Sequence, residues 1–346
     1  MSSSFRTLIY TVLLSVVLGA ASGILGTAWT SSYLSDYAFQ LSELTAPLRV
    51  DQEKPRNVPS SYNEAVAGLI ESSLPSVVEI YRTMAGPLGY SSDDISDRGV
   101  ILTTDGWVAI VSIDPSRVSS FKTARVLANG EMYSVSESVY DSITQTLFLK
   151  LDAHNLPVAS FGNGRETRLG EQVFVVESSR AFLPATISEH VWPQAESGSS
   201  DKPQRRLLLD KEISEGFLVF NLSGDVIGFG QDRIVLPFES ILPAFRSLLE
   251  TKKISRASLG VNYVDLSHQV DISFKLSRGL KNGALVYGNS KNKWFQVGDI
   301  ILTINVESLN STKGLDEILE EYKVGDKISI TFDRAGEVKT VEVILK

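Results

Sequence analysis

The stretch from Asp210 to Gly230, DKEISEGFLVFNLSGDVIGFG, holds the side chains best suited to acyl-transfer chemistry. Ser214 carries a hydroxyl that could act as a nucleophile, and Glu215 and Gly216 follow it. Such a hydroxyl needs a base that removes its proton, a group that orients the base, and backbone donors for the oxyanion. Lys211 is the nearest basic residue, but a lysine acts as a base only when its neutral form is favoured, and nothing in the surrounding sequence predicts that.

The three histidines of the chain, His154, His190 and His268, lie far apart in the sequence. We expect the first in a surface turn, the second in a strand and the third in another domain, so none is placed to act as the base for Ser214. They also lack the spacing of zinc ligands, and the absence of cysteine excludes disulfides, thiolate nucleophiles and cysteine-bound metals. The sequence therefore predicts no metal site and no cofactor.

Length and charge restrict the class of protein. With 346 residues, the chain is long enough for two globular domains. Its formal net charge is −8, and acidic and basic residues are mixed along the chain rather than segregated. Because a nucleic-acid surface needs clustered lysine and arginine to neutralise phosphates, we expect no nucleic acid among the partners.

An uncharged apolar run, residues 7–29, follows Arg6 near the N-terminus. At about 1.5 Å per residue it can cross a hydrocarbon core of about 30 Å, which predicts a transmembrane anchor over residues 1–30. A cleaved signal peptide is the alternative, because small residues occur near Ala20, although apolar residues continue beyond them. Arg6 on the short side favours a cytoplasmic N-terminus, with the bulk of the chain outside.

Beyond the apolar run, residues 31–61 are polar and proline-containing, which predicts a linker. Over residues 62–252, short apolar runs alternate with turn residues, the pattern of an antiparallel barrel or sandwich. Pro75 separates a short amphipathic helix from the first strand, and Ala128-Asn129-Gly130 is typical of a hairpin turn. Apolar residues at helical spacing over 236–253 predict a helix that closes this domain.

The remaining residues, 253–346, form a second predicted unit with a pattern of its own. SLGVNYV and GALVYG indicate strands, and GDIILTINVESL indicates a strand that enters a loop. GLDEILEEYKVGD predicts a helix that ends near Gly325, and KISITFDRAGEVKTVEVIL predicts a hairpin.

Several of these segments follow one another in a recognisable order: PSVVEI, GVILTTDGWV, LANGEMYSVSESVYDSITQTLFLKLDAHNLPVASFGN, LGEQVFVV, NLSGDVIGFG and SRASLGV. In this order and spacing, behind an anchor, the chain from Pro75 to Lys346 resembles the HtrA/Deg (DegP/DegS-like) family of extracytoplasmic serine proteases. The resemblance implies a mostly β fold: an N-terminal transmembrane helix, a chymotrypsin/trypsin-like double β-barrel over 62–252, and a PDZ domain over 253–346.

The resemblance also implies where a catalytic triad would lie. The position of the base histidine falls on Ile113, that of the orienting aspartate on Gln145, and that of the nucleophile on Glu215. None of these residues can take the corresponding role, and Ser214 in a shifted register would still lack a base. We therefore predict a degenerate member of the family, a pseudoprotease that is not an enzyme.

The second domain carries the predicted binding site. By the resemblance, Leu259 and Gly260 offer backbone N–H groups to a peptide C-terminal carboxylate, and the strand from Val261 pairs with the peptide. Leu315 and Leu319, one helical turn apart, would line the other wall of the groove. The alternative for these two leucines is that they are core residues of an amphipathic helix.

Together these features predict a non-catalytic scaffold or sensor for protein quality control or complex assembly. It would be a single-pass protein of the bacterial inner membrane with its domains in the periplasm. Its expected partners are protein or peptide C-termini, together with an active protease or another membrane protein, and residues 33–70 could form a homotrimer. An active serine endopeptidase of the HtrA/Deg type and a structural subunit of a membrane complex are the alternatives.

Overall fold

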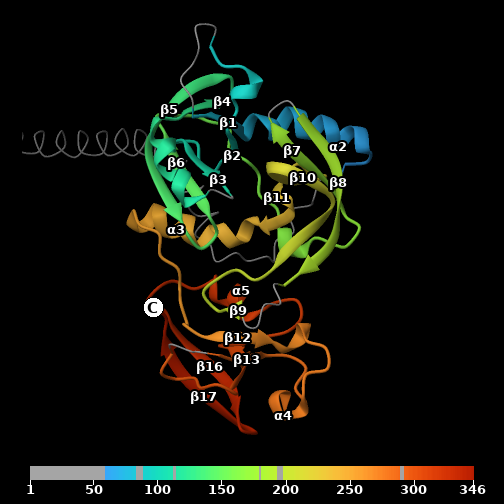
Figure 1. Ribbon diagram of the computed structural model, residues 1–346, viewed down its shortest axis with the longest axis vertical. Coiled ribbons are helices and arrows are strands. Elements are labelled where there is room, and N and C mark those ends of the chain that lie inside the picture. The colour runs from blue at the N-terminus through green and yellow to red at the C-terminus, as the bar shows by residue number, and fades with distance from the viewer. Residues whose placement is uncertain (1–58, 83–88, 112–113, 179–180, 193–197, 289–291) are drawn as a thin grey trace, which may run out of the picture. The chain divides into compact units, whose positions relative to one another are not determined.

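The computed structural model describes residues 59–82, 89–111, 114–178, 181–192, 198–288 and 292–346 (Figure 1). The predicted membrane segment, and most of the predicted linker and trimerisation segment, lie outside these ranges. Within the ranges, no helix is long and apolar enough to cross a membrane.

The described chain begins with the predicted short helix, α2 (Tyr62–Gly68). The Ser61 hydroxyl accepts a hydrogen bond from Glu64 N at 3.2 Å, which satisfies a free N–H of the first turn. Further helical turns continue to Ser76, and the first strand starts directly after them, as predicted. The proline at position 75 thus stands within the last turn before the strand, not after the helix end.

The first six strands form a closed antiparallel barrel in the order β1-β2-β3-β6-β5-β4. They are β1 (Val77–Tyr81), β2 (Asp97–Ile101), β3 (Trp107–Ile110), β4 (Arg125–Ala128), β5 (Glu131–Asp141) and β6 (Thr146–Leu151). The predicted turn connects β4 to β5, with positive φ at both Asn129 (48°) and Gly130 (82°). These angles match the right-handed twist of the flanking strands, so the local sequence sets this hairpin.

A second sheet of four strands has the order β11-β10-β7-β8, and β10 also pairs with β8. The strands are β7 (Gln172–Ser178), β8 (Ala181–Val191), β10 (Arg206–Asn221) and β11 (Val226–Pro237). The early part of β10 pairs with β8 and the later part with β7, so one long strand connects both sides of this second barrel. Its interior is an apolar cluster that includes Val175, Ile187 and Val219.

Helix α3 (Leu242–Thr251), which the helical spacing predicts, follows the second barrel and packs on the first. Phe245 stacks on Phe148 with ring centroids 5.4 Å apart and meets the edge of Trp107 at 6.3 Å. Lys252 ends the helix in the left-handed conformation, with φ of 61°. The helix therefore closes the double barrel before the chain enters the last domain.

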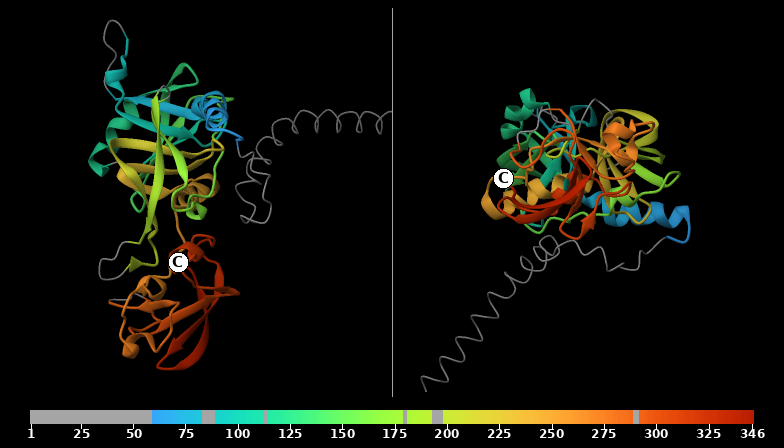
Figure 2. Two further views of the ribbon diagram at one scale, coloured as in Figure 1. Left: turned by 90° about the vertical axis from the view of Figure 1, so that its right-hand side faces the viewer. Right: turned by 90° about the horizontal axis from the view of Figure 1, so that it is seen from below.

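The last domain is a sheet accompanied by the short helices α4 and α5 (Figure 1, Figure 2). Its elements are β12 (Asn262–Asp265), α4 (Phe274–Ser277), β13 (Ala284–Val286), β14 (Ile300–Ile304), β15 (Glu307–Ser308), α5 (Leu315–Leu319), β16 (Lys327–Arg334) and β17 (Glu337–Ile344). The predicted hairpin is β16 and β17, whose two turn residues, Ala335 and Gly336, have φ of 56° and 91°. Helix α5 is shorter than predicted, with five residues.

One strand of this sheet comes from elsewhere in the chain. Strand β9 (Gly198–Ser199), which lies between β8 and β10 in sequence, pairs antiparallel with β12. The sheet order is therefore β17-β16-β14-β13-β12-β9, with β15 beside β14. The sequence did not predict this strand.

A buried ion pair connects the start of the last domain to the first barrel. Arg256 Nη2 lies 2.5 Å from Asp141 Oδ2, and its Nη1 donates to the Ser240 carbonyl at 3.0 Å. Asp141 ends β5, is 2% exposed, and also accepts from the Thr144 hydroxyl at 2.6 Å. Removing one member of a buried pair leaves the other charge without compensation in a place that water does not reach.

We predict that Arg256→Met lowers the free energy of unfolding by about 3 kcal/mol, because Asp141 keeps only neutral partners. Lys327→Met, at the exposed pair with Glu342, is the matched control and should change it by less than about 1 kcal/mol. Urea-induced unfolding followed by tryptophan fluorescence measures both. Equal changes for the two variants would contradict the assignment.

Candidate functional site

The stretch that could carry acyl-transfer chemistry lies in an irregular part of β10. Ile213 pairs with Asp232, and Phe217 pairs with Gly230. Between these two pairs β10 advances by four positions, whereas β11 advances by only two. The three residues 214–216 thus face the single residue 231 and form a bulge, after which Phe217 to Val219 pair regularly. This part of the chain is therefore a bulged strand, and from Phe217 onward β10 and β11 form a hairpin.

The structure brings none of the three predicted triad positions into a described contact with another. Ile113 lies outside the described residues, and so does the side chain of Glu215, whose backbone belongs to β10. Gln145 is exposed in the turn between β5 and β6, with φ of 55°. The roles assigned to these three positions stay predictions.

The histidines lie in the three settings that the sequence predicts. His154 is exposed in a turn after β6. His190, in β8, lies 3.2 Å from the Thr167 hydroxyl, and burial followed by the charge of Arg205 lowers its pKa. His268 belongs to the last domain and stacks on Trp192 with ring centroids 3.6 Å apart.

A carboxylate occupies the predicted peptide-terminus loop of the last domain. Asp201 Oδ1 accepts hydrogen bonds from Leu259 N and Gly260 N, both at 3.1 Å. Asp201 Oδ2 accepts one from the Ser258 hydroxyl at 2.7 Å. The two predicted backbone donors thus point at one carboxylate group, and the sequence reasoning missed both Asp201 and Ser258.

The strand that starts after this loop also takes the predicted kind of partner. Val261 O accepts from Ser200 N at 2.9 Å, and Val261 N donates to the Ser200 hydroxyl at 3.2 Å. Ser199 and Gly198 then pair in register with the first two residues of β12. In this structure the added strand is a segment of the same chain.

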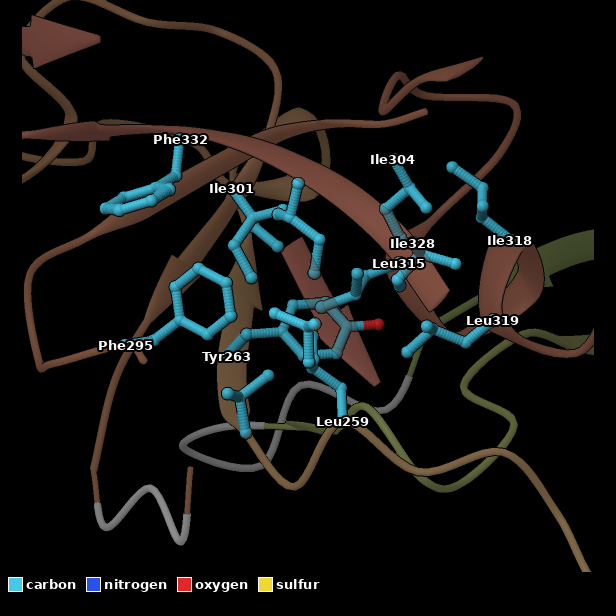
Figure 3. Close-up of a cluster of buried hydrophobic side chains, with 14 of the residues drawn as sticks. Leu259, Tyr263, Phe295, Ile301, Ile304, Leu315, Ile318, Leu319, Ile328 and Phe332 are labelled. Carbon is cyan, nitrogen blue, oxygen red and sulfur yellow. The ribbon is translucent and has the colours of Figure 1, made fainter. Parts of the chain in front are cut away.

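The two predicted groove leucines belong to the apolar cluster of the domain. Leu315 and Leu319 are 0% and 1% exposed, and Figure 3 shows both pointing from α5 toward the side where Leu259 and Tyr263 lie. Such burial is what the core alternative expects of them. Their contact with a bound peptide stays a prediction.

A cluster of buried charges lies next to α5. Arg205, which is 5% exposed, holds Glu317 with Nε at 2.8 Å from Oε1 and donates to the Thr312 carbonyl at 2.5 Å. Arg165, in the turn Gly164–Glu166, pairs with Glu320. Burial opposes the charge of Arg165, but Glu320, Glu317 and Glu239 hold its pKa above the ordinary value. Each cation is therefore held by carboxylates from the helix that borders the predicted groove.

Burial also governs the acids of this cluster. It raises the pKa of Asp316, which accepts hydrogen bonds from the Tyr263 hydroxyl and from Gln204 N, both at 2.7 Å. It raises the pKa of Glu317 and, with Arg165 acting in the opposite direction, raises the pKa of Glu320 to about 7. Among the described residues no group of histidines and acids has the arrangement of a metal site.

The fold and site define a class of protein: a trypsin-like double β-barrel followed by a PDZ domain. The model of the PDZ domain family matches residues 258–345. The solved structure titled "HtrA-type protease AlgW with tripeptide" covers 82% of this chain and is itself covered to 96%, with a TM-score of 0.58 at 19% identity. This likeness concerns the fold.

Two curated relatives match by sequence. The chain is 25% identical over 268 residues to a "Probable periplasmic serine endoprotease DegP-like" of Marinomonas sp. (strain MWYL1), covering 72% of this chain and 56% of that protein. It is 22% identical over 387 residues to the "Serine protease Do-like HtrA" of Lactobacillus helveticus, covering 95% of this chain and 94% of that protein. This chain spans just over half the length of the first relative and nearly all of the second. The chain is therefore similar to HtrA/DegP-like serine proteases over most of its length, and its residues 258–345 match the PDZ domain family.

These comparisons contradict one prediction. We expected a protein that is not an enzyme, whereas the relatives are named serine proteases and endoproteases. That expectation depended on Ile113, Gln145 and Glu215, and the structure describes the side chain of Gln145 alone. The comparisons support the alternative, a serine endopeptidase, better than the predicted non-catalytic scaffold.

The raised pKa of Glu320 has a consequence for stability. Its ordinary value is 4.5, so between pH 4.5 and about 7 the folded protein holds a proton that the unfolded chain has lost. Stability contributed by the neutral form is complete below pH 4.5 and is lost as the pH rises through about 7. We predict that Glu320→Gln flattens this fall in the free energy of unfolding by about 1–3 kcal/mol.

Urea unfolding at a series of pH values between 5 and 8 measures this slope. Glu321→Gln is the control, because Glu321 is the next residue and its side chain is 49% exposed in a pair with Lys313. It should leave the slope as in the parent chain. A slope that Glu320→Gln does not change would show that Glu320 is already ionised at pH 5 in the folded protein.

Proposed function

We propose that this chain is an extracytoplasmic serine endopeptidase of the HtrA type whose PDZ domain receives polypeptide C-termini. The observation that carries the proposal is the loop Ser258–Gly260, which directs three hydrogen-bond donors at one carboxylate. That carboxylate stands at the end of a strand added to β12. An extended peptide with a free C-terminus offers the same two features, a strand edge and a terminal carboxylate.

The endopeptidase part of the proposal is supported by the family. Relatives that match most of this chain are named serine proteases, one from Lactobacillus helveticus and one from Bacillus subtilis. The reaction would be hydrolysis of a peptide bond through an acyl-enzyme on a serine hydroxyl. We assign this step to Ser214, which lies in the β10 bulge beside the position that aligns with the family nucleophile. Lys211, the nearest basic residue, would accept the hydroxyl proton in its neutral form.

The names of two further relatives, both probable periplasmic endoproteases, support the proposed extracytoplasmic location. The apolar run over residues 7–29 would tether the chain to the membrane surface. This part of the proposal depends on the sequence of that run. Substrates and partners would then be proteins exposed outside the cytoplasm.

A fluorophosphonate probe and casein test the catalytic part on the full chain. We expect covalent labelling and casein cleavage, and a loss of at least about 10³-fold in cleavage for Ser214→Ala. Ser223→Ala, in the exposed turn between β10 and β11, is the matched control and should keep both activities. Absence of labelling and cleavage in the parent chain would contradict endopeptidase activity, and labelling that survives in Ser214→Ala would place the nucleophile elsewhere.

A further inference from the structure

The segment Gly198–Asp201 enters the PDZ domain with the polarity of a peptide ligand. It runs antiparallel to β12, with Gly198 opposite Tyr263 and Ser199 opposite Asn262. Its C-terminal end therefore lies at the loop that precedes β12, where a bound peptide ends. The segment takes the edge of the sheet that an external strand would need.

The end of this segment supplies the group that a peptide terminus would supply. The side-chain carboxylate of Asp201 accepts from two backbone N–H groups at 3.1 Å and from a hydroxyl at 2.7 Å. Hydrogen bonds to an ionised acceptor are stronger than those between neutral groups. Because the same N–H groups cannot bind a second carboxylate at full strength, Asp201 and a peptide C-terminus compete for them.

The segment is held in place by more than its carboxylate. Ser200 is 3% exposed, and its hydroxyl donates to Asp201 Oδ1 at 2.8 Å. Gln204 Nε2 donates to the carbonyls of Ser199 at 3.0 Å and Lys202 at 2.8 Å, and so closes the turn after the strand. Gln204 N donates to Asp316 on α5 at 2.7 Å, which fixes that turn to the helix.

We propose that Gly198–Asp201 is a built-in ligand of the PDZ groove, which a polypeptide C-terminus must displace in order to bind. This inference rests on the peptide binding proposed above and adds its regulation. A tethered ligand acts at a high effective concentration whatever the protein concentration is. The apparent affinity for an external C-terminus is therefore the intrinsic affinity multiplied by the fraction of molecules in which the segment is displaced.

The test uses the full chain in detergent and a pool of fluorescein-labelled decapeptides with varied last three residues and a free carboxylate. Fluorescence anisotropy gives the apparent affinity for the pool. Asp201→Asn keeps the shape of the side chain but removes its charge, so the apparent affinity should rise at least about tenfold. The same pool with amidated C-termini should bind neither form, because it lacks the competing group.

An engineered disulfide would make the opposite change, because it would hold the segment in the groove. The chain has no cysteine of its own that could form another disulfide. Ser199 and Asn262 stand opposite each other in the two strands. The backbone hydrogen bond from Ser200 N to Val261 O flanks this pair, so Ser199 and Asn262 form a non-hydrogen-bonded pair of the antiparallel ladder. In such pairs the Cα atoms lie about 4.5 Å apart, within the range of a disulfide. Ser199→Cys with Asn262→Cys should bind the free-acid pool at least about tenfold more weakly when oxidised than when reduced, whereas the parent chain should ignore the reductant.

The outcomes distinguish a failure of this inference from a failure of the proposed peptide binding. If the parent chain, Asp201→Asn and the oxidised double variant all bind the free-acid pool equally well, the internal segment is no competitor and the inference is wrong while peptide binding stands. If the amidated pool binds as well as the free-acid pool, competition for the carboxylate loop is wrong. If none of the forms binds the free-acid pool, the proposed peptide binding fails and the inference with it.

Discussion

The guanidinium of Arg205 is the interaction on which the arrangement around the PDZ groove depends. Arg205 directly precedes β10, a few residues after the segment Gly198–Asp201, and it is nearly fully buried. It donates to the Arg165 carbonyl at 2.8 Å and to the Thr312 carbonyl at 2.5 Å, and it is paired with Glu317. A buried charge is tolerated only with such partners, so the residues before and after it have little choice of position.

The same need of buried charges for partners bears on the acidic residues that border the predicted groove for a peptide carboxylate. Asp316, Glu317 and Glu320 all lie on or next to α5, and burial raises the pKa of each. Two arginines, at 165 and 205, compensate them from segments that belong to the double barrel. Glu317 and Glu320 are thereby paired with cations, and Asp316 accepts from the Tyr263 hydroxyl and Gln204 N. The donors of the loop Ser258–Gly260 are left for a carboxylate.

Much of the fold could be predicted because its signals are local. The hairpin at Asn129-Gly130 and the hairpin over β16 and β17 depend on residues adjacent in sequence, and both are present. The predicted donors Leu259 and Gly260 do face a carboxylate, since the loop sequence itself sets the direction of its N–H groups. Leu315 and Leu319 show the limit of spacing: their periodicity predicts a helix face, but core and groove leucines give the same pattern.

What could not be predicted depends on partners distant in sequence. Asp201 stands in a short polar stretch without periodicity, and its two N–H donors come 58 and 59 residues later. The pair of Arg165 and Glu320 spans 155 residues. Nor does the sequence show that β10 runs through residues 214–216 as a bulge, since its partner strand sets that register. The predicted absence of enzyme activity failed for a related reason, because it inferred chemistry from three aligned positions without their surroundings.

The segment Gly198–Asp201 would make the apparent affinity of the groove independent of its sequence preference. Recognition would be set by residues of the PDZ domain around Leu259 and α5, whereas the ligand concentration needed for half occupancy would be set by the fit of a four-residue stretch outside that domain. A single change at Asp201 could then shift the response threshold by at least about tenfold without altering the preferred sequence. Descendants of such a chain could be retuned to scarce or abundant ligands by mutation at that one position.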